Sequence, residues 1–537
     1  MKITTPLILV VALFLTVMLR QPYSHSGFLS NDEGVYTTNA LVLSKGGFLF
    51  RDAFDHKPPG FNYLYYWILS AADFRMSAVR YVFTLLIALH ILAFHALMRD
   101  HFPAPVALAQ TLLIAILPNV GPFFDFQAAH PEIPMMVFAT MSLTFLNVAT
   151  RQPPSGTLCF LSGVFWGCSF QMKQAGITLI VPLLYLLLVR IPTVPTGSTG
   201  TLNGALIRLS TCFIAGFSII LVISVTPFAI HGALGDFTLG FFQYNRFYFH
   251  GMNLLDMAVV NLQSLQRLFS VSPVVYFAAA IGLIVALRQA FGIRSDASLV
   301  SESRRARFVL LWFASSLIGA LLGKKGFLHY YIQLLPPIAV LSFYPVLPIF
   351  KLRIRAPALI TSFVLTAFAA TDAIVHQSAY SDHPAQSLHS ILHPGDSFQY
   401  VTQPRAQAIA DYIRLNTSPS DRIFVWGFFP QLYALSERLP ATRFSFCQPL
   451  IGVDIAPDRN AMPEETRLFM ERLQTIAASE FETHLPAIVI DTAPVGFWGW
   501  KDAPLTTIDR IGSLVRERYD RTTQFWGMDV YRLRQQP

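Results

Sequence analysis

Charged side chains are scarce in this chain. Asp, Glu, Lys and Arg make up 13% of its 537 residues, about half the share that a soluble globular protein carries. Hydrophobic residues make up 53% and gather in long runs, which is typical of a protein with several membrane-spanning helices. The formal charge of +8 does not indicate binding to nucleic acid, because most of the cations flank apolar runs, where they orient helices.

Cysteine is also rare, and the four thiols are Cys159, Cys168, Cys212 and Cys447. Three of them lie in apolar runs and none has the spacing of a metal motif, so we expect neither a disulfide framework nor a zinc site. The chain also lacks an internal repeat. No small-x-small cleavage site follows its first apolar run, so we interpret that run as an uncleaved membrane helix.

Eleven apolar runs are long enough, or nearly long enough, to cross a bilayer, which takes about 20 residues in a helix. Several of them are short, especially 157–172 and 174–190, and are expected to tilt against protein or to span the bilayer in part. The segment 59–72 is apolar and aromatic but too short to span, and is expected at the interface or leading into the next helix. The eleven runs are residues 5–20, 76–98, 104–120, 132–149, 157–172, 174–190, 207–230, 271–288, 308–323, 329–350 and 356–375.

Basic residues predict how these helices are oriented. The positive-inside rule places the loops that hold most of the cations in the cytoplasm. The N-terminus then faces the cytoplasm, and the alternate loops, with everything after about residue 376, face the periplasm. The cytoplasmic set is Lys2, Arg99, Arg151, Arg190, Arg208, Arg288, Arg294, Arg304, Arg305, Arg307, Lys351, Arg353 and Arg355.

The part of the chain after about residue 376 has a different composition. Helical periodicity marks residues 405–416, 464–479 and 506–519, and strand patterns mark 423–426, 486–491 and 528–533. Strands that alternate with helices indicate an α/β domain. We therefore predict an α-helical polytopic membrane protein with a transmembrane domain at 1–375 and a C-terminal extracytoplasmic α/β domain at 376–537.

Two adjacent acids, Asp32 and Glu33, follow the first apolar run. On a helix they point about 100° apart, so they cannot face each other as a catalytic pair. One can act as a base while the other orients it. Alternatively, Asn31 or Asp32 caps a helix that starts near Gly34, and Glu33 favours the positive end of that helix.

The second outer loop offers two more acids, Asp125 and Glu132. Glu132 starts an apolar run and has a proline on either side at Pro131 and Pro134. A carboxylate is stabilised at a helix start in any case, so a structural role explains it as well as a functional one. The sequence does not decide which of the two acids serves a site.

Several cations lie in outer loops against the positive-inside rule, and charges beside the apolar zone tend to be functional or to reach for lipid headgroups. Lys57 stands before two prolines, which limit chain entropy and aim the lysine, and its ammonium suits phosphate. Lys173 lies between two apolar runs. Arg246 lies in an aromatic loop that interfacial anchoring also explains. His329 and Tyr330 follow a basic corner at residues 323–326, which holds Lys324 and Lys325. His329 alone is more often structural than catalytic, and an aromatic residue such as Tyr330 is usually an interfacial anchor there.

Acids and cations on one side of a membrane suit displacement at a sugar carbon with a lipid phosphate as the leaving group. The attacking hydroxyl needs a base, which a carboxylate supplies. The leaving phosphate needs charge stabilisation, which Lys or Arg supplies. One base with several cations fits an inverting transferase better than a hydrolase.

The motif order resembles that of the GT-C glycosyltransferases that use polyprenyl-phosphate sugars, in the branch of the bacterial relatives of protein O-mannosyltransferases and lipid A aminoarabinose transferases. The resemblance covers residues 5–350. Its most specific parts are the two acids of the first loop and the Lys-Pro-Pro corner. In order, the motifs are Asp-Glu-Gly-Val-Tyr, Asp-His-Lys-Pro-Pro-Gly, Pro-Glu-x-Pro, Lys-Gln and His-Tyr-Tyr.

The resemblance implies roles for individual residues. Asp32 would be the catalytic carboxylate, with Glu33 in support. Lys57, and with it Lys173, would bind the donor phosphate. The acid of the second loop would be Glu132 or Asp125, and the supporting or acceptor residues would be His329, Tyr330 and Arg246.

The resemblance also implies the partners and the location. The donor would be a polyprenyl-phosphate sugar at the outer face of a bacterial inner membrane, and the acceptor a hydroxyl of a lipid, glycan or protein. No cofactor is predicted, although the residues leave a divalent metal open. The competing functions are a transporter or flippase for lipid-linked sugars and a non-catalytic assembly protein. A transporter should show repeated halves with polar residues at mid-membrane, which we do not find, and an assembly protein leaves the first-loop motifs unexplained.

Overall fold

The computed structural model describes residues 4–120, 125–151, 153–190, 201–248, 254–292, 297–347, 364, 366–367, 371, 403–451 and 463–534. The chain divides into two compact units. The first, here called the helical unit, is Met1–His25, Arg80–Ser224 and Leu254–Phe398. The second, here called the α/β unit, is Ser26–Val79, Val225–Asn253 and Gln399–Pro537.

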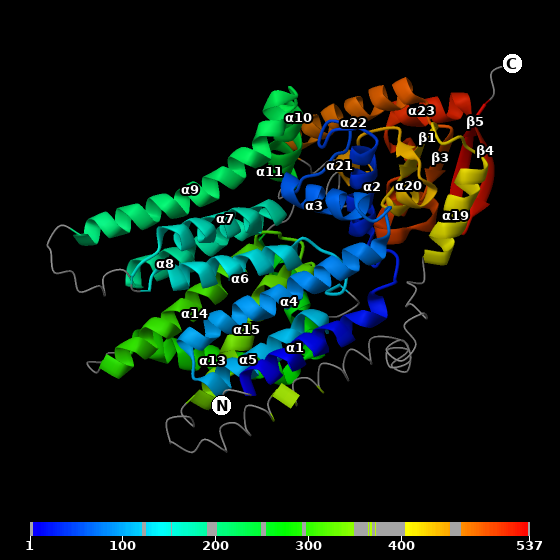
Figure 1. Cartoon of the computed structure of the whole chain (residues 1–537). Coiled ribbons are helices and arrows are strands. Elements are labelled where there is room, and N and C mark those ends of the chain that lie inside the picture. Colours follow the sequence, from blue (N-terminus) through cyan, green and yellow to red (C-terminus); the bar gives the residue numbers. More distant parts are fainter. Residues whose placement is uncertain are drawn as a thin grey trace. The chain divides into compact units, whose positions relative to one another are not determined.

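The helical unit is a bundle of apolar helices, seen in Figure 1. In this bundle α1 packs along α5, α6 along α7, and α13 along α14. Most of the helices match an apolar run of the sequence, because such runs satisfy every backbone group internally as helices. The helices of the bundle are α1 Thr4–Arg20, α4 Met76–His101, α5 Ala104–Ile116, α6 Glu132–Ala149, α7 Gly156–Met172, α8 Ile180–Arg190, α9 Thr201–Ile230, α12 Leu254–Val271, α13 Pro273–Phe291, α14 Ala297–Leu321 and α15 Leu335–Leu341.

Five stretches of helix in the described part of the chain are long and apolar enough to cross a membrane. Two shorter apolar helices accompany them, Ala104–Asn119 and Gln174–Val189. The expected membrane protein is confirmed in this respect, while the total of about eleven spans stays a prediction. The five are Thr5–Tyr23, Met76–His101, Glu132–Ala149, Gly204–Ile230 and Pro273–Phe291.

The expected continuous helix at 329–350 is wrong. The described part of this run consists of the 3₁₀ helix η7 Leu328–Leu334, the short helix α15, and the 3₁₀ turn η8 Tyr344–Val346. Prolines at 336, 337 and 345 remove backbone donors and restrict the preceding residues, so no long helix can form. The first of these short pieces, η7, follows Lys324 and Lys325 and carries His329 and Tyr330.

The helix α12 was not foreseen, since residues 231–270 were expected only as an outer loop. It buries Asn261, Ser264 and Leu268 on one side and exposes Val259 and Leu262 on the other. The helix contains too many polar residues for the sequence to show it as an apolar run.

The α/β unit contains a five-stranded sheet of order β2-β1-β3-β5-β4. Strand β1 is parallel to both β2 and β3, whereas β5 is antiparallel to β3 and β4. The expected α/β domain and its three predicted strands are confirmed, and β2 and β4 are additional. The strands are β1 Arg422–Trp426, β2 Leu439–Pro440, β3 Ile488–Asp491, β4 Tyr519–Phe525 and β5 Met528–Leu533.

Helices cover both faces of this sheet. On one face, α19 Gln403–Leu415 and α20 Gln431–Ser436 pack against alternate residues of β1, β3 and β5. On the other, Phe481 of α22 Glu464–His484 meets Phe424 of β1 at 5.2 Å between ring centres. The helix α23 Asp509–Arg518 leads into β4.

The first outer loop belongs to the α/β unit as well. It forms α2 Asn31–Ser44 and α3 Pro59–Ser70. The unit also contains three short turns, α10 Leu234–Phe237, the π-helical η6 Thr238–Tyr244 and α11 Asn245–Tyr248. The predicted domain boundary between residues 375 and 376 and most of the predicted span 356–375 lie outside the described residues.

Candidate functional site

The helix α2, which carries the two adjacent acids, is fixed at its first turn. Ser30 caps it by accepting a hydrogen bond from the Glu33 backbone N–H at 3.3 Å. The buried Glu33 carboxylate accepts one from the Leu29 N–H at 2.7 Å. This reciprocal arrangement is a form of the capping box. The expected helix start near Gly34 with an Asn31 or Asp32 cap is therefore wrong.

The two acids consequently sit in different surroundings. Glu33 is buried and bonded to the backbone. Asp32 is half-buried in the same turn. The positive end of the helix dipole favours a carboxylate at this position.

The C-terminal domain contacts this same turn of α2. Asn31 donates from Nδ2 to the carbonyl of Phe428 at 2.8 Å and accepts from Nε2 of Gln431 at 3.2 Å. Further along α2, Thr38 donates to the carbonyl of Pro430 at 3.0 Å. The residues 428–431 follow β1 directly, so the carboxyl end of that strand fixes the position of the helix.

A buried acid that was not among the predicted site residues lies beside Lys57. The Asp55 carboxylate is 0% exposed and accepts hydrogen bonds from the backbone N–H groups of His56 at 2.7 Å and Lys57 at 3.1 Å. Asn62 donates to it at 2.8 Å, and the Lys57 ammonium lies 3.9 Å away. Asp55 therefore holds both the backbone and the charge of Lys57.

Electrostatics keeps this buried acid ionised. Burial alone raises the pKa of the Asp55 carboxyl. The ammonium of Lys57, the imidazole of His56 and the hydrogen bond from Asn62 outweigh that effect and lower the pKa below its ordinary value of 3.8. The result is a charged carboxylate paired with a lysine whose side chain is 13% exposed.

Lys57 is also tied to α2. Its ammonium lies 4.9 Å from the ring centre of Tyr36, in range for a cation–π contact. Asn39 of α2 donates to the Asn62 side chain at 2.9 Å, and Asn62 in turn donates to Asp55. The α/β unit thus brings Lys57 and the helix of Asp32 into one hydrogen-bonded group.

Arg246 lies elsewhere on the α/β unit. Its guanidinium forms an ion pair with Glu465 at 2.9 Å, and both side chains are more than half exposed. Its neighbour Asn245 donates to the carbonyl of His56 at 2.6 Å. The segment of Arg246 is therefore joined to the Lys57 loop, but its own charge is shared with a surface acid.

The helical unit holds a second group, centred on Lys173. The lysine lies between α7 and the 3₁₀ helix η4 Gln174–Leu179, and its ammonium forms an ion pair with Glu132 at the start of α6. It also lies 3.4 Å from the ring centre of Tyr330. Glu132 is fully buried and the Lys173 side chain is 15% exposed. Three residues that the sequence placed in separate loops therefore form one cluster.

Asp125 has other partners. The Nδ1 of His329 lies 3.1 Å from its carboxylate and the Nε2 of His130 lies 3.2 Å from it. The two imidazole rings stack with centres 4.0 Å apart. Burial alone raises the pKa of Asp125, but both histidines together lower it. Glu132 thus pairs with Lys173 and Asp125 with the two histidines, in adjoining groups that meet where the rings of His329 and Tyr330 lie 5.0 Å apart.

Carboxylate and imidazole groups are ligands that divalent metals take. In the described part of the helical unit, such groups come together at Asp125, His130 and His329. His130 was not among the predicted site residues. Its position in the loop before Glu132 was visible in the sequence, but its stacking on a residue 199 positions later was not.

The loop of Asp125 is held by a buried arginine that the sequence did not single out. Arg20, at the end of α1, is 4% exposed. It donates to the side chain of Asn119 at 3.3 Å and to the carbonyls of Phe126 and Gln127 at 3.4 and 3.1 Å. These bonds to a charged donor fix the loop backbone.

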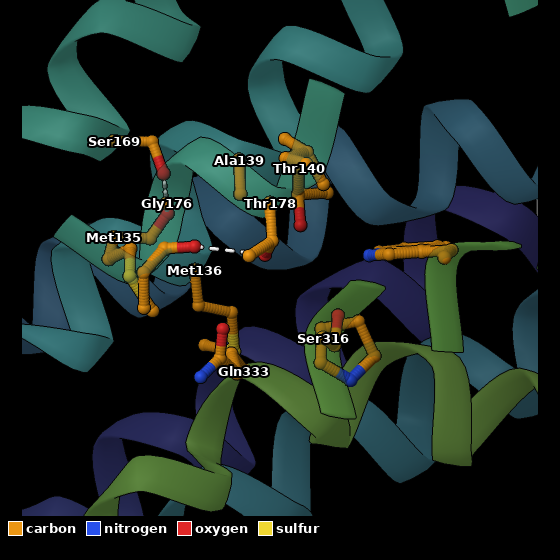
Figure 2. Close-up of a pocket in the computed structure, with 13 residues that line it drawn as sticks. Met135, Met136, Ala139, Thr140, Ser169, Gly176, Thr178, Ser316 and Gln333 are labelled. Atoms are coloured by element: carbon orange, nitrogen blue, oxygen red, sulfur yellow. Dashed lines mark hydrogen bonds between the residues drawn. The ribbon is translucent and has the colours of Figure 1, made fainter. Parts of the chain in front are cut away.

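A small cavity of about 20 Å³ lies among the helices beside the Lys173 turn. Figure 2 shows hydroxyl and amide groups around it, with Ser169 donating to the Met135 carbonyl at 3.0 Å. The Thr140 hydroxyl is fully buried and has no hydrogen-bond partner among the described residues. The cavity has room for about one water molecule and is too small for a sugar or a phosphate.

Comparison with known protein families finds a model that matches part of the chain. The sequence model of the dolichyl-phosphate-mannose-protein mannosyltransferases matches residues 56–222. This range includes Lys57, Asp125, Glu132 and Lys173. A search of the curated proteins finds no match.

Solved structures resemble the whole chain. ArnT from Cupriavidus metallidurans in the apo state has a TM-score of 0.58 at 13% identity, over 99% of this chain and 98% of that one. The same protein bound to undecaprenyl phosphate gives 0.55 at 13% identity, over 98% and 97%. The apo oligosaccharyltransferase from Archaeoglobus fulgidus gives 0.53 at 14% identity, over 92% of this chain and 70% of that one.

At such identities the structural matches establish the fold, and the family match adds the relationship in sequence. The expected resemblance is confirmed, and with it the membrane-embedded helical fold and the C-terminal α/β domain. The chain has the GT-C fold and is related, through residues 56–222, to the dolichyl-phosphate-mannose-protein mannosyltransferases.

Proposed function

We propose that the chain transfers a sugar from a polyprenyl-phosphate carrier to a hydroxyl of a lipid, glycan or protein. The transfer takes place with inversion at the outer face of a bacterial inner membrane. The observation that carries the proposal is the mannosyltransferase match over residues 56–222, which begins at the loop where Lys57 is aimed by a buried acid. The solved ArnT holds undecaprenyl phosphate and the archaeal oligosaccharyltransferase AglB holds dolichol phosphate with an inhibitory peptide, which supports a lipid phosphate here.

In this proposal Asp32 is the general base that takes the proton of the acceptor hydroxyl. Its neighbour Glu33 orients the turn through the Leu29 N–H. The positive end of the helix dipole favours a carboxylate at this position, and a carboxylate can act as a base. The domain that holds Asn31 through residues 428–431 keeps this turn in position.

Lys57 receives the negative charge of the leaving phosphate. The ammonium is already desolvated in large part and oriented by Asp55, so little reorganisation accompanies the reaction. Its exposed fraction of 13% leaves one side open to a ligand. Phosphate binding then competes with the 3.9 Å contact to Asp55, which is too long for a strong hydrogen bond.

Lys173 assists with the donor phosphate in the same proposal, while Glu132 holds it in place and Tyr330 lies under its ammonium. Asp125 and His329 are proposed to position the acceptor. The scheme uses no cofactor. A requirement for a divalent cation would direct attention to Asp125, His130 and His329.

The test uses membranes that contain the full chain, a radiolabelled polyprenyl-phosphate sugar and candidate acceptors, with and without a chelator. Asp32→Asn should lower the transfer rate at least a hundredfold, as loss of a general base does. Lys57→Ala should lower it by a similar factor. Asp52→Asn and Lys45→Ala, two exposed residues of the same loop, serve as controls and should keep the wild-type rate.

Each outcome decides a part of the proposal. If the Asp32→Asn variant transfers sugar at the wild-type rate, Asp32 is not the base. If no lipid-phosphate sugar serves as a donor, the proposed class of glycosyltransferase is wrong. Movement of a labelled lipid-linked sugar between leaflets, without transfer to an acceptor, supports the transporter instead.

A further inference from the structure

A large pocket lies in the helical unit at the end of α4, and none of the residues used in the proposed reaction lines it. Its volume is about 600 Å³, within the range of small-molecule sites. Three helix ends build it. They contribute Asp100 and His101 of α4, Tyr185, Leu186 and Val189 of α8, and Val300, Ser301, Arg304, Arg305 and Phe308 of α14.

The pocket presents positive charge. Its lining contains two arginines, Arg304 and Arg305, and one acid, Asp100. That acid is already in an ion pair with Arg151 and accepts a hydrogen bond from Asn147. The lining acid is therefore neutralised, and the exposed guanidinium of Arg304 favours an anion.

The two arginines have different tasks. Arg305 donates to the carbonyl of His101 at 3.0 Å and lies 4.9 Å from the ring centre of Phe102, so it ties α14 to the end of α4. Arg304 has an exposed side chain. Its backbone carbonyl accepts a bond from the Tyr185 hydroxyl at 3.0 Å, which places its guanidinium at the pocket without occupying it.

The pocket also has an apolar wall, and its surroundings are those of a membrane boundary. Leu186, Val189 and Phe308 supply the apolar wall. On α8, Leu184 and Leu188 are 44% and 54% exposed, as expected for side chains that meet lipid tails. A guanidinium beside such a surface meets the level at which headgroup phosphates lie.

We propose that this pocket binds the phosphate headgroup of an anionic phospholipid, with Arg304 on the phosphate and the acyl chains along α8. The sequence places these arginines on the cytoplasmic side, where anionic lipids attract basic residues. A small soluble anion would use the same guanidinium but would leave the apolar wall in contact with water. The site is separate from the proposed reaction and does not depend on it.

Native mass spectrometry of the full chain in detergent tests the proposal. Phosphatidylglycerol, phosphatidylcholine and inorganic phosphate are titrated in separate arms. Phosphatidylglycerol should bind most tightly, and Arg304→Gln should weaken it about fivefold, the contribution of one basic residue near an anionic surface. Val189→Trp, which fills the pocket, should weaken it as well. Arg208→Gln removes an exposed arginine outside the pocket and should change nothing.

Equal binding of phosphatidylglycerol by wild type and by both pocket variants would overturn the proposal. So would equal affinity for phosphatidylcholine, or displacement of the lipid by millimolar inorganic phosphate, which would make this a soluble-anion site. Thermal unfolding of each variant in the same detergent shows whether a loss of binding comes from a loss of structure.

Discussion

Gln431 donates a hydrogen bond to Asn31 at 3.2 Å across 400 residues of sequence. The bond joins the first residue of α20 to the first turn of α2, which also holds Asp32. The same contact brings the backbone of Gln431 against Gly34, where a side chain would have no space. The C-terminal domain therefore positions the helix that carries the proposed base.

Gly34→Ala should displace α2 from the C-terminal domain. A Cβ at residue 34 would lie 2.7 Å from the Gln431 backbone N and 3.1 Å from its Cα, and backbone atoms cannot move aside as a side chain would. We expect a loss of about 1–3 kcal/mol, the usual effect of overpacking, and a larger relative loss of sugar transfer.

The matched control for this substitution is Gly204→Ala in α9, where an added Cβ meets nothing within 4 Å. Because Ala favours a helix over Gly, this control should keep or raise the melting temperature. If Gly34→Ala melted and reacted as the wild type does, the proposed fixing of α2 by residue 431 would be wrong.

Periodicity and composition predicted the elements that their own residues determine. The buried strands β1 and β3 are runs of apolar residues, and the turn at Lys173 lies between two apolar runs. By contrast, β4 has mostly exposed, polar residues and forms because β5 offers it a partner. No pattern within residues 519–525 marks it as a strand.

The site was predictable as a set of residues but not as a set of partners. The sequence pointed to Lys57 and Lys173 because each is a cation beside apolar segments. It could not show that Asp55 is buried against the first or that Glu132 pairs with the second. These pairings depend on tertiary contacts, which local sequence does not encode.

Asp55→Asn should destabilise the chain by about 3–5 kcal/mol, because it leaves the buried Lys57 ammonium without its partner. The double variant Asp55→Asn/Lys57→Met should recover part of that loss. Chemical denaturation of the single and double variants measures the coupling between the two residues. Simple addition of the two single effects would show that the pair is not coupled.

The same carboxylate gives a dependence on pH. Its pKa is lowered on folding from 3.8, so the unfolded chain binds the proton more readily. The stability it contributes is present in full above the unfolded value and is lost as the pH falls through the folded value. Melting temperatures between pH 3 and 7 should show an acid-side decline that is smaller in Asp55→Asn.

Variants of the Lys173–Glu132 pair distinguish its contribution to stability from its role in the reaction. Lys173→Met and Glu132→Gln should each destabilise the helical unit by about 3–5 kcal/mol, because each leaves the buried charge of the other residue without its partner. The double variant removes both charges and should regain most of this stability. Its KM for the donor should stay high, because no ammonium remains there to meet the phosphate. A double variant with wild-type donor KM would remove Lys173 from the donor site.

Asp491 at the end of β3 should respond to pH in the opposite sense to Asp55. Burial raises its pKa from 3.8 to about 6, with Asp529 acting in the same direction and the N–H groups of Ala493 and Leu505 opposing. The folded chain then holds this proton more tightly than the unfolded chain. Stability is therefore highest below the unfolded value and falls as the pH rises from about 4 to 6.

A shift of this size corresponds to about 3 kcal/mol at most. Hydrogen exchange of the β1 and β3 amides in the full chain, corrected for the intrinsic pH dependence of exchange, should show weaker protection at pH 7 than at pH 5. Asp491→Asn, which carries no titrating proton and keeps an oxygen for the Ala493 N–H, should flatten that difference. Protection that rose with pH in the wild type, or an unchanged slope in the variant, would contradict a neutral carboxyl at this strand end.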